Sequence, residues 1–147
     1  MKILRNTLMA AALSVAALTG LIMTAPSVAT AAAADLRLFA PLTGLVNGVQ
    51  ATGDARFRDR TTIQDFNVNL SSVNAANGTI LDVLLVQGKT DVLPGTTTKM
   101  GTIKLKTKRG ALDLSTATGD NIPKVVVGDV VLIQYQGTTV MTGVFGN

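Results

Sequence analysis

The sequence of residues 35–147 predicts an all-β fold, either an antiparallel β-sandwich or a closed, Greek-key-like barrel of about eight to ten short strands. Runs rich in Val, Leu, Ile and Thr alternate with turns that are centred on glycine. No segment keeps a helical period over several turns, and Gly or Pro interrupts the chain every few residues. Short strands joined by regularly spaced turns are typical of these two architectures.

The first 34 residues predict a secretory signal peptide that is cleaved before Asp35. Lys2 and Arg5 are followed by the apolar run LMAAALSVAALTGLIM and by TAPSVATAAAA, where small residues offer several cleavage positions. An uncleaved membrane anchor is the alternative, because the apolar run approaches the length that spans a bilayer. The stacked alanines favour cleavage, so we expect no transmembrane segment in the mature chain. The predicted protein is bacterial in type and exported to the periplasm, the cell surface or the medium.

The strand boundaries follow from the apolar runs and the turns between them. The first predicted strand, 36–46, ends at VNGV, where Asn47-Gly48 is a strong hairpin signal. Alternating small or apolar and charged residues predict 49–58 as its partner. The same criteria, applied along the rest of the chain, predict strands at 62–70, 79–87, 91–94, 99–107, 110–116, 124–127, 129–135 and 138–145.

Similar features recur at an offset of about 48 residues and predict two related halves. DVLLVQG in the first half resembles DVVLIQYQG in the second, and three further pairs share the offset: Gly53 and Gly101, Asp65 and Asp113, and Gly95 and Gly143. We therefore expect a single domain over 35–147. It consists of an extra strand 36–46, a first unit at about 48–95 and a second unit at about 96–143, related by a pseudo-twofold axis.

Each half contains a strand with basic residues at alternate positions, GDARFRDR and GTIKLKTK. If Lys108-Arg109 forms a two-residue turn, Lys104 lies opposite Asp113, and the same register in the first half places Arg56 opposite Asp65. We interpret both as cross-strand ion pairs that set the register. Four cations then have no assigned carboxylate and are the candidate anion-binding residues near two turns: Arg58, Arg60, Lys106 and Lys108.

The composition excludes several kinds of active site. The chain has no His, Cys or Trp, and all 9 acidic residues are aspartates. Histidine and cysteine catalysis and His- or Cys-ligated metal centres therefore cannot form. We expect no catalytic residue, no cofactor and no metal site, since TGDN offers calcium a single carboxylate. Removing Lys2 and Arg5 from the 13 basic residues leaves 11, a net charge of +2, and with few aromatics nucleic-acid binding is not expected.

These observations favour a non-catalytic structural, adhesive or self-assembling protein of the cell surface or matrix. Strand-forming residues at both ends of the domain, DLRLFA and Thr138–Phe145, are predicted to pair at sheet edges with other subunits. The alternative is a binding module for an anionic polysaccharide or a lipid head group, which would use the four candidate cations. A third and weaker hypothesis is an aspartate-only hydrolase.

Overall fold

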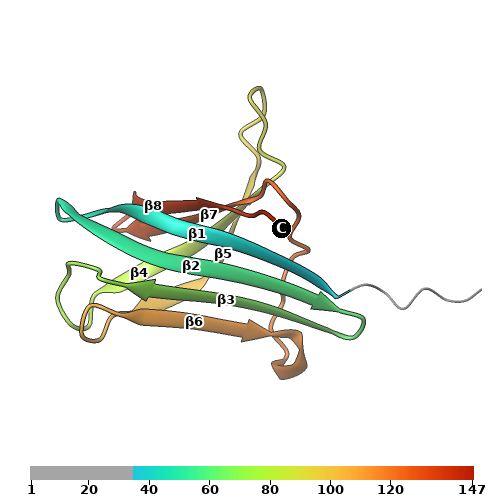
Figure 1. The fold of residues 1–147 in the computed structure, drawn as a ribbon, viewed down its shortest axis with the longest axis horizontal. Coiled ribbons are helices and arrows are strands. Elements are labelled where there is room, and N and C mark those ends of the chain that lie inside the picture. Colours follow the sequence, from blue (N-terminus) through green and yellow to red (C-terminus); the bar gives the residue numbers. More distant parts are fainter. Residues whose placement is uncertain (1–34) are drawn as a thin grey trace, which may run out of the picture. The chain divides into compact units, whose positions relative to one another are not determined.

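The computed structural model describes residues 35–147, and the predicted signal peptide lies outside the described residues. The described chain is all β, with eight antiparallel strands in one nearly closed, barrel-like sheet (Figure 1). The elements, in chain order, are β1 (Leu36–Val46), β2 (Val49–Arg60), β3 (Ile63–Ser71), β4 (Ile80–Gln87), β5 (Thr96–Lys104), β6 (Gly110–Ser115), the short 3-10 helix η1 (Thr116–Thr118), β7 (Val130–Tyr135) and β8 (Thr138–Val144). The sheet resembles the barrel alternative rather than the sandwich.

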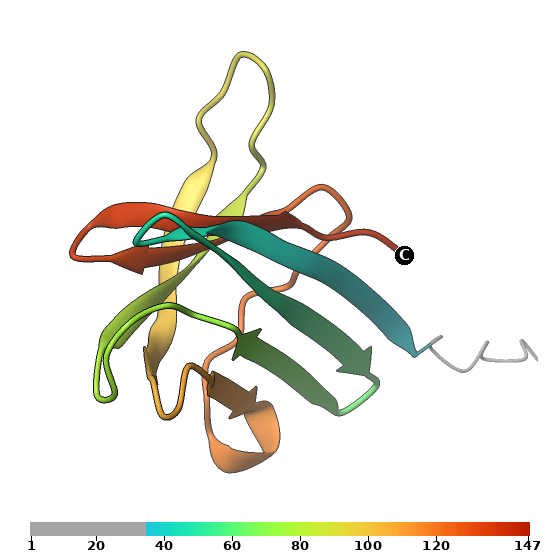
Figure 2. The same cartoon turned by 60° about the vertical axis from the view of Figure 1, so that its left-hand side comes forward.

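The strands follow one another around the sheet in the order β5-β4-β7-β8-β1-β2-β3-β6. β5 and β6 are therefore the two ends of the sheet, although they are consecutive in the chain. A tight turn joins them, and the only bridge between them links Lys106 to Arg109. Figure 2 shows the two strands diverging from this turn. The barrel closes at the turn and stays open along the rest of the β5–β6 boundary.

Side chains that point inward at alternate strand positions form the core. Phe57, Phe66 and Phe145 are its largest members, and the rings of Phe66 and Phe145 meet edge to face with centroids 6.2 Å apart. Burying each such ring contributes about 1.5–3 kcal/mol. The segment between η1 and β7 adds Ile122 and Val125 to the core, so it helps to cover the barrel interior.

Two predicted strands are wrong. Residues 91–94 lie in a hairpin loop between β4 and β5 that projects from the barrel, with Val92 88% exposed (Figure 1). Residues 124–127 lie in the connection before β7, and Val125 is the one buried residue among these four. Proline and glycine flank both short apolar runs, which leaves too few residues for a ladder. The first predicted half thus contributes three strands and the second four, and the duplication is not confirmed.

The predicted ion pairs Lys104–Asp113 and Arg56–Asp65 are also wrong. In the β2–β3 ladder Asp65 lies opposite Arg58, and Arg56 lies opposite Asn67. Asp113 belongs to the β3–β6 ladder and also lies opposite Asn67. The turn between β5 and β6 is centred one residue earlier than expected, and β6 pairs with β3 instead of β5. The observed β2–β3 register differs from the predicted one by an even number of residues. Because side chains alternate between the two faces of a strand, an even shift leaves the predicted division into inward and outward residues unchanged.

The strands expected at sheet edges are interior strands. β1 lies between β8 and β2, and β8 lies between β7 and β1. The β1–β8 junction is short, with Thr43 opposite Thr142 and Gly44 opposite Met141. A Cβ atom on Gly44 would lie 1.9 Å from the backbone oxygen of Val140, so only glycine allows this approach. The account of assembly through β1 and β8 therefore loses its structural basis.

Candidate anion-binding site

The turn between β5 and β6 presents four exposed cations within six residues: Lys104, Lys106, Lys108 and Arg109. We call this group the cationic turn. None of the four forms an ion pair within the part of the chain that the structure describes, where the salt bridges involve other cations. Four uncompensated positive charges at one end of a domain whose net charge is small create a local positive potential.

The backbone of the turn has an unusual conformation that neighbouring residues hold in place. Thr107 and Lys108 have φ angles of 52° and 60°, in the left-handed region. Lys106 and Arg109 exchange two backbone hydrogen bonds, of 2.7 and 3.1 Å. The side chain of Asn77 accepts a 2.7 Å hydrogen bond from the Thr107 amide. The β3–β4 loop therefore fixes the position of the cations by binding the turn that presents them.

Replacing Thr107 with asparagine should stabilise the domain, because a β-branched residue is costly in the left-handed region and asparagine tolerates it. We expect the free energy of unfolding to rise by about 1 kcal/mol in urea titrations followed by circular dichroism. Thr102→Asn, at an exposed position of β5, should give no gain and serves as the control. An unchanged stability of Thr107→Asn would mean that the turn is not strained.

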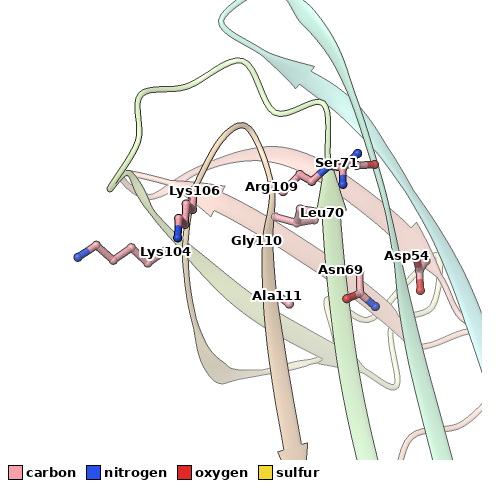
Figure 3. Close-up of a pocket in the computed structure, with 9 residues that line it drawn as sticks. All are labelled: Asp54, Asn69, Leu70, Ser71, Lys104, Lys106, Arg109, Gly110 and Ala111. Carbon is pink, nitrogen blue, oxygen red and sulfur yellow. The ribbon is translucent and has the colours of Figure 1, made fainter.

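A cavity of about 570 Å³ lies beside the cationic turn (Figure 3). The small residues Gly110 and Ala111 form part of its lining, next to Asn69 and Ser71 of β3. The side chains fan out from the turn: that of Lys104 extends outward, and that of Arg109 extends toward Ser71 (Figure 3). The volume lies in the range of small-ligand sites.

Lysine and arginine side chains donate hydrogen bonds and carry a permanent positive charge at neutral pH. Lys106 and Arg109 on one side of the cavity, with Asn69 and Ser71 on the other, can bind a carboxylate, sulfate or phosphate group. Asp54 is the single carboxylate that lines the cavity, and its Oδ2 atom lies 2.8 Å from Nε of Arg56. The site therefore offers an anion more donors than competing acceptors.

Arg58 and Arg60, the other two predicted anion-binding residues, lie at the opposite end of the barrel from Lys106 and Lys108. The β3–β6 ladder spans the distance, from Asp65 opposite Ser115 to Leu70 opposite Gly110. Both arginines have carboxylate partners: Arg58 donates to Asp35 at 2.9 Å, and Arg60 pairs with Asp65. The structure therefore does not bring the four predicted residues together.

The ion pairs of Arg58 and Arg60 also shift the pKa values of their partners, Asp35 and Asp65. The guanidinium of Arg60, and then the hydroxyl of Ser115, lower the pKa of Asp65. Hydrogen bonds from Arg58, and then from Arg37, lower the pKa of Asp35 well below its usual value. The arginines are thus compensated by carboxylates that stay ionised. Their positive charge is less accessible to an external anion than that of the cationic turn.

Sequence reasoning missed Lys104 and Arg109 as site residues. The predicted register pairs Lys104 with Asp113 and places Arg109 in the turn itself. The run KLKTKR, with four cations among six residues, contains the signal. The run KLKTKR indicates a site only when β6 is known to pair with β3, because the predicted pairing of β6 with β5 gives Lys104 a carboxylate partner.

The aspartates are dispersed over the described domain. The cavity beside the cationic turn is lined by Asp54, and a second hollow, on the outer surface of β1–β3, is lined by Asp65. Asp129 is buried, and its carboxylate accepts hydrogen bonds from the backbone amides of Gly88 and Val126. No three acidic residues within 35–147 gather closely enough to hold a metal ion.

Comparison with known protein families, with curated proteins and with solved structures finds no match for this chain. Within residues 35–147, no helix is long and apolar enough to cross a membrane. The geometry of the domain itself is therefore the basis for a functional proposal.

Proposed function

We propose that the protein is an exported, non-catalytic binding module that retains anionic glycans through the cationic turn. One observation supports this most strongly: three cations of the cationic turn, Lys104, Lys106 and Arg109, line a cavity of about 570 Å³ that also offers hydroxyl and amide groups, and none of the three has an ion-pair partner among the described residues. Acidic sugars present carboxylate or sulfate groups to the cations and hydroxyl groups to Asn69 and Ser71. Outside the cell, polysaccharides are an abundant source of such groups.

The arrangement of carboxylates supports a non-catalytic role. Hydrolysis by aspartates requires two carboxyl groups on either side of the scissile bond, with one pKa raised. The cavity at the cationic turn and the second hollow are each lined by one aspartate, and the pKa of Asp65 is lowered by its hydrogen bond with Arg60. The arrangement therefore supports binding without turnover.

Binding of digalacturonate to the mature protein, measured by isothermal titration calorimetry at several salt concentrations, tests the proposal. We expect measurable affinity at about 20 mM salt that falls strongly by about 500 mM, because salt screens exposed charges. A neutral disaccharide, maltose, should not bind at either concentration. Absence of digalacturonate binding at low salt, or binding that salt does not weaken, would contradict the proposal.

Self-association is a second candidate function, and one observation favours it. β5 is a nine-residue strand at the end of the sheet, and its bonding to β6 is restricted to the bridge at the turn. An unpaired strand edge can bind a strand of another copy. Sedimentation velocity over a wide concentration range should then show dimers or larger species. Monomers alone at every concentration would rule this function out.

A further inference from the structure

The second hollow, of about 490 Å³, lies on the outer surface of β1, β2 and β3 and contains Phe39. We call it the Phe39 hollow. The other exposed large apolar side chains include Val92 and Leu93 in the projecting hairpin and Leu45 and Val49 beside a turn. Phe39 instead lies in the middle of a paired strand and is still 46% exposed. An aromatic ring displayed on the outside of a sheet is available for stacking by a ligand.

The surroundings of Phe39 fix its ring. Its backbone exchanges two hydrogen bonds of 2.9 Å with Gly146, beyond the end of β8. The guanidinium of Arg56, which lies opposite it on β2, is 5.9 Å from the ring centroid. This cation–π contact orients the ring and leaves much of it exposed to solvent. The ring is thus held before any ligand arrives, which lowers the entropic cost of binding.

Planar polar side chains from neighbouring strands surround the ring. Arg58 and Asp65 lie opposite each other, as do Arg56 and Asn67. Asp35 pairs with Arg37 and Arg58, and Asp54 pairs with Arg56. Each arginine that lines the hollow therefore has a carboxylate partner, and the hollow keeps many donors and acceptors. A pyranose ring has an apolar face of C–H groups and a rim of hydroxyl groups. A pyranose ring therefore fits an aromatic ring that is surrounded by charge-compensated polar side chains better than a free anion fits it.

One ion pair joins the lining of the Phe39 hollow to the lining of the cavity at the cationic turn. Asp54 lines the cavity and Arg56 lines the hollow, and their side chains form an ion pair at 2.8 Å. Asp54 and Asn69 form one cross-strand pair, and Arg56 and Asn67 form the next outward-pointing pair. Phe39 is aligned across the ladders with Arg56, Asn67 and Asp113, and Asp113 lies four residues from Arg109. The two sites are therefore about 13 Å apart along the strands and three strand spacings of about 4.8 Å apart across them, so a saccharide of several rings reaches from one to the other but a disaccharide does not.

We propose that the Phe39 hollow is a sugar-ring subsite and that one acidic polysaccharide chain occupies it together with the cationic turn. This inference rests on the proposed function and narrows the ligand. A polymer of acidic sugars can supply an anionic group to Lys106 and Arg109 and a ring to Phe39. A lipid head group or a single acidic sugar can reach only one of the two sites.

The test compares a galacturonate octamer with digalacturonate in titration calorimetry. Phe39→Ala should lower the affinity for the octamer about tenfold, the scale of one lost stacking contact, and leave the affinity for digalacturonate unchanged. Val92→Ala, which removes a more exposed apolar side chain far from the hollow, is the matched control and should change neither affinity. Circular dichroism confirms that each variant is folded.

Phe39→Trp provides a direct readout, since the chain contains no tryptophan. Its emission should change when the octamer binds and stay constant when digalacturonate binds. Adding Lys104→Gln and Lys106→Gln to this variant should raise the octamer concentration required and preserve the emission change at saturation. This result separates contact at Phe39 from binding at the cationic turn.

Two results overturn the inference while the proposed function stands: an octamer affinity that Phe39→Ala leaves unchanged and Lys104→Gln with Lys106→Gln lowers, or an octamer that binds Phe39→Trp without altering its emission. Binding to vesicles of anionic phospholipid without binding to the octamer also overturns it. Failure of the wild-type protein to bind either saccharide removes the proposed function and the subsite together.

Discussion

Replacing Gly44 with alanine should unfold the domain or lower its free energy of unfolding by about 4 kcal/mol or more. A Cβ atom at this position would lie 1.9 Å from the Val140 oxygen and 2.7 Å from the Met141 Cα, all of them backbone atoms that a rotamer change cannot move. The clash falls on the β1–β8 junction, whose ladder has only two residue pairs. Separating β1 from β8 would open the barrel on the side away from the β5–β6 turn. Urea and thermal unfolding followed by circular dichroism measure the effect.

Gly146→Ala is the control for this prediction. Gly146 also lies at the contact between β1 and the end of the chain, but an added Cβ there has no neighbour within 4 Å. Its effect should stay within about 0.5 kcal/mol. If Gly44→Ala proved as stable as the wild-type protein, β1 and β8 could not be packed as described. The order of strands around the barrel would then need revision.

The double variant Lys104→Gln, Lys106→Gln should lower the affinity for digalacturonate by about tenfold or more. Both side chains line the cavity, and each charge-assisted hydrogen bond contributes more than a neutral one. Glutamine keeps much of the length and polarity of lysine, so lost binding reflects lost charge. Both positions are exposed, so the free energy of unfolding should change by less than about 0.5 kcal/mol.

Lys89→Gln with Lys124→Gln removes the same net charge from exposed positions away from the cationic turn. Its affinity for digalacturonate should stay within about twofold of the wild-type value, since exposed charges beyond a Debye length contribute little. Equal losses in the two double variants would show that net charge alone attracts the ligand. The cationic turn would then not be a site.

Strand alternation predicted the inward and outward residues of the barrel well. The basic residues at alternate positions of GDARFRDR predict that the arginines share one face of β2, and the structure places Phe57 in the core between Arg56 and Arg58. The Asn47-Gly48 turn was predicted correctly because both residues adopt positive φ, which these residue types tolerate. Local periodicity and turn chemistry contain this information, so no knowledge of distant pairing was needed.

Pairing between distant strands could not be predicted in the same way. β6 was expected to pair with β5, its neighbour in the chain, but it pairs with β3. The amide of Asn77 and the backbone of Gly78 and Thr79 bind residues at the β5–β6 turn and fix its position. That contact joins the β3–β4 loop to the β5–β6 turn, about thirty residues further along the chain. Hydrophobic periodicity within a strand gives no information about contacts over this separation.

The sequence predicted only some of the residues of the candidate site. Lys106 and Lys108 are predicted because no carboxylate is assigned to them, and neither has an ion-pair partner among the described residues, but only Lys106 lines the cavity. The same argument failed for Arg58 because its partner, Asp35, lies just before β1 and outside the hairpin used for the assignment. Phe39 was not predicted as a site residue, because the run LRLFAPL does not by its composition show which face is outward. Only the ladder with β2 reveals its outward position beside Arg56.

A titration of isotopically labelled protein with digalacturonate, followed by the chemical shifts of backbone amides, tests the central claim most directly. We predict that the largest changes fall on residues 104–111 at the β5–β6 turn and on residues 69–71 at the end of β3. Changes confined to the segment from Arg58 to Asp65, or uniform small changes over the whole surface at saturation, would contradict the claim that the cationic turn binds anionic sugars.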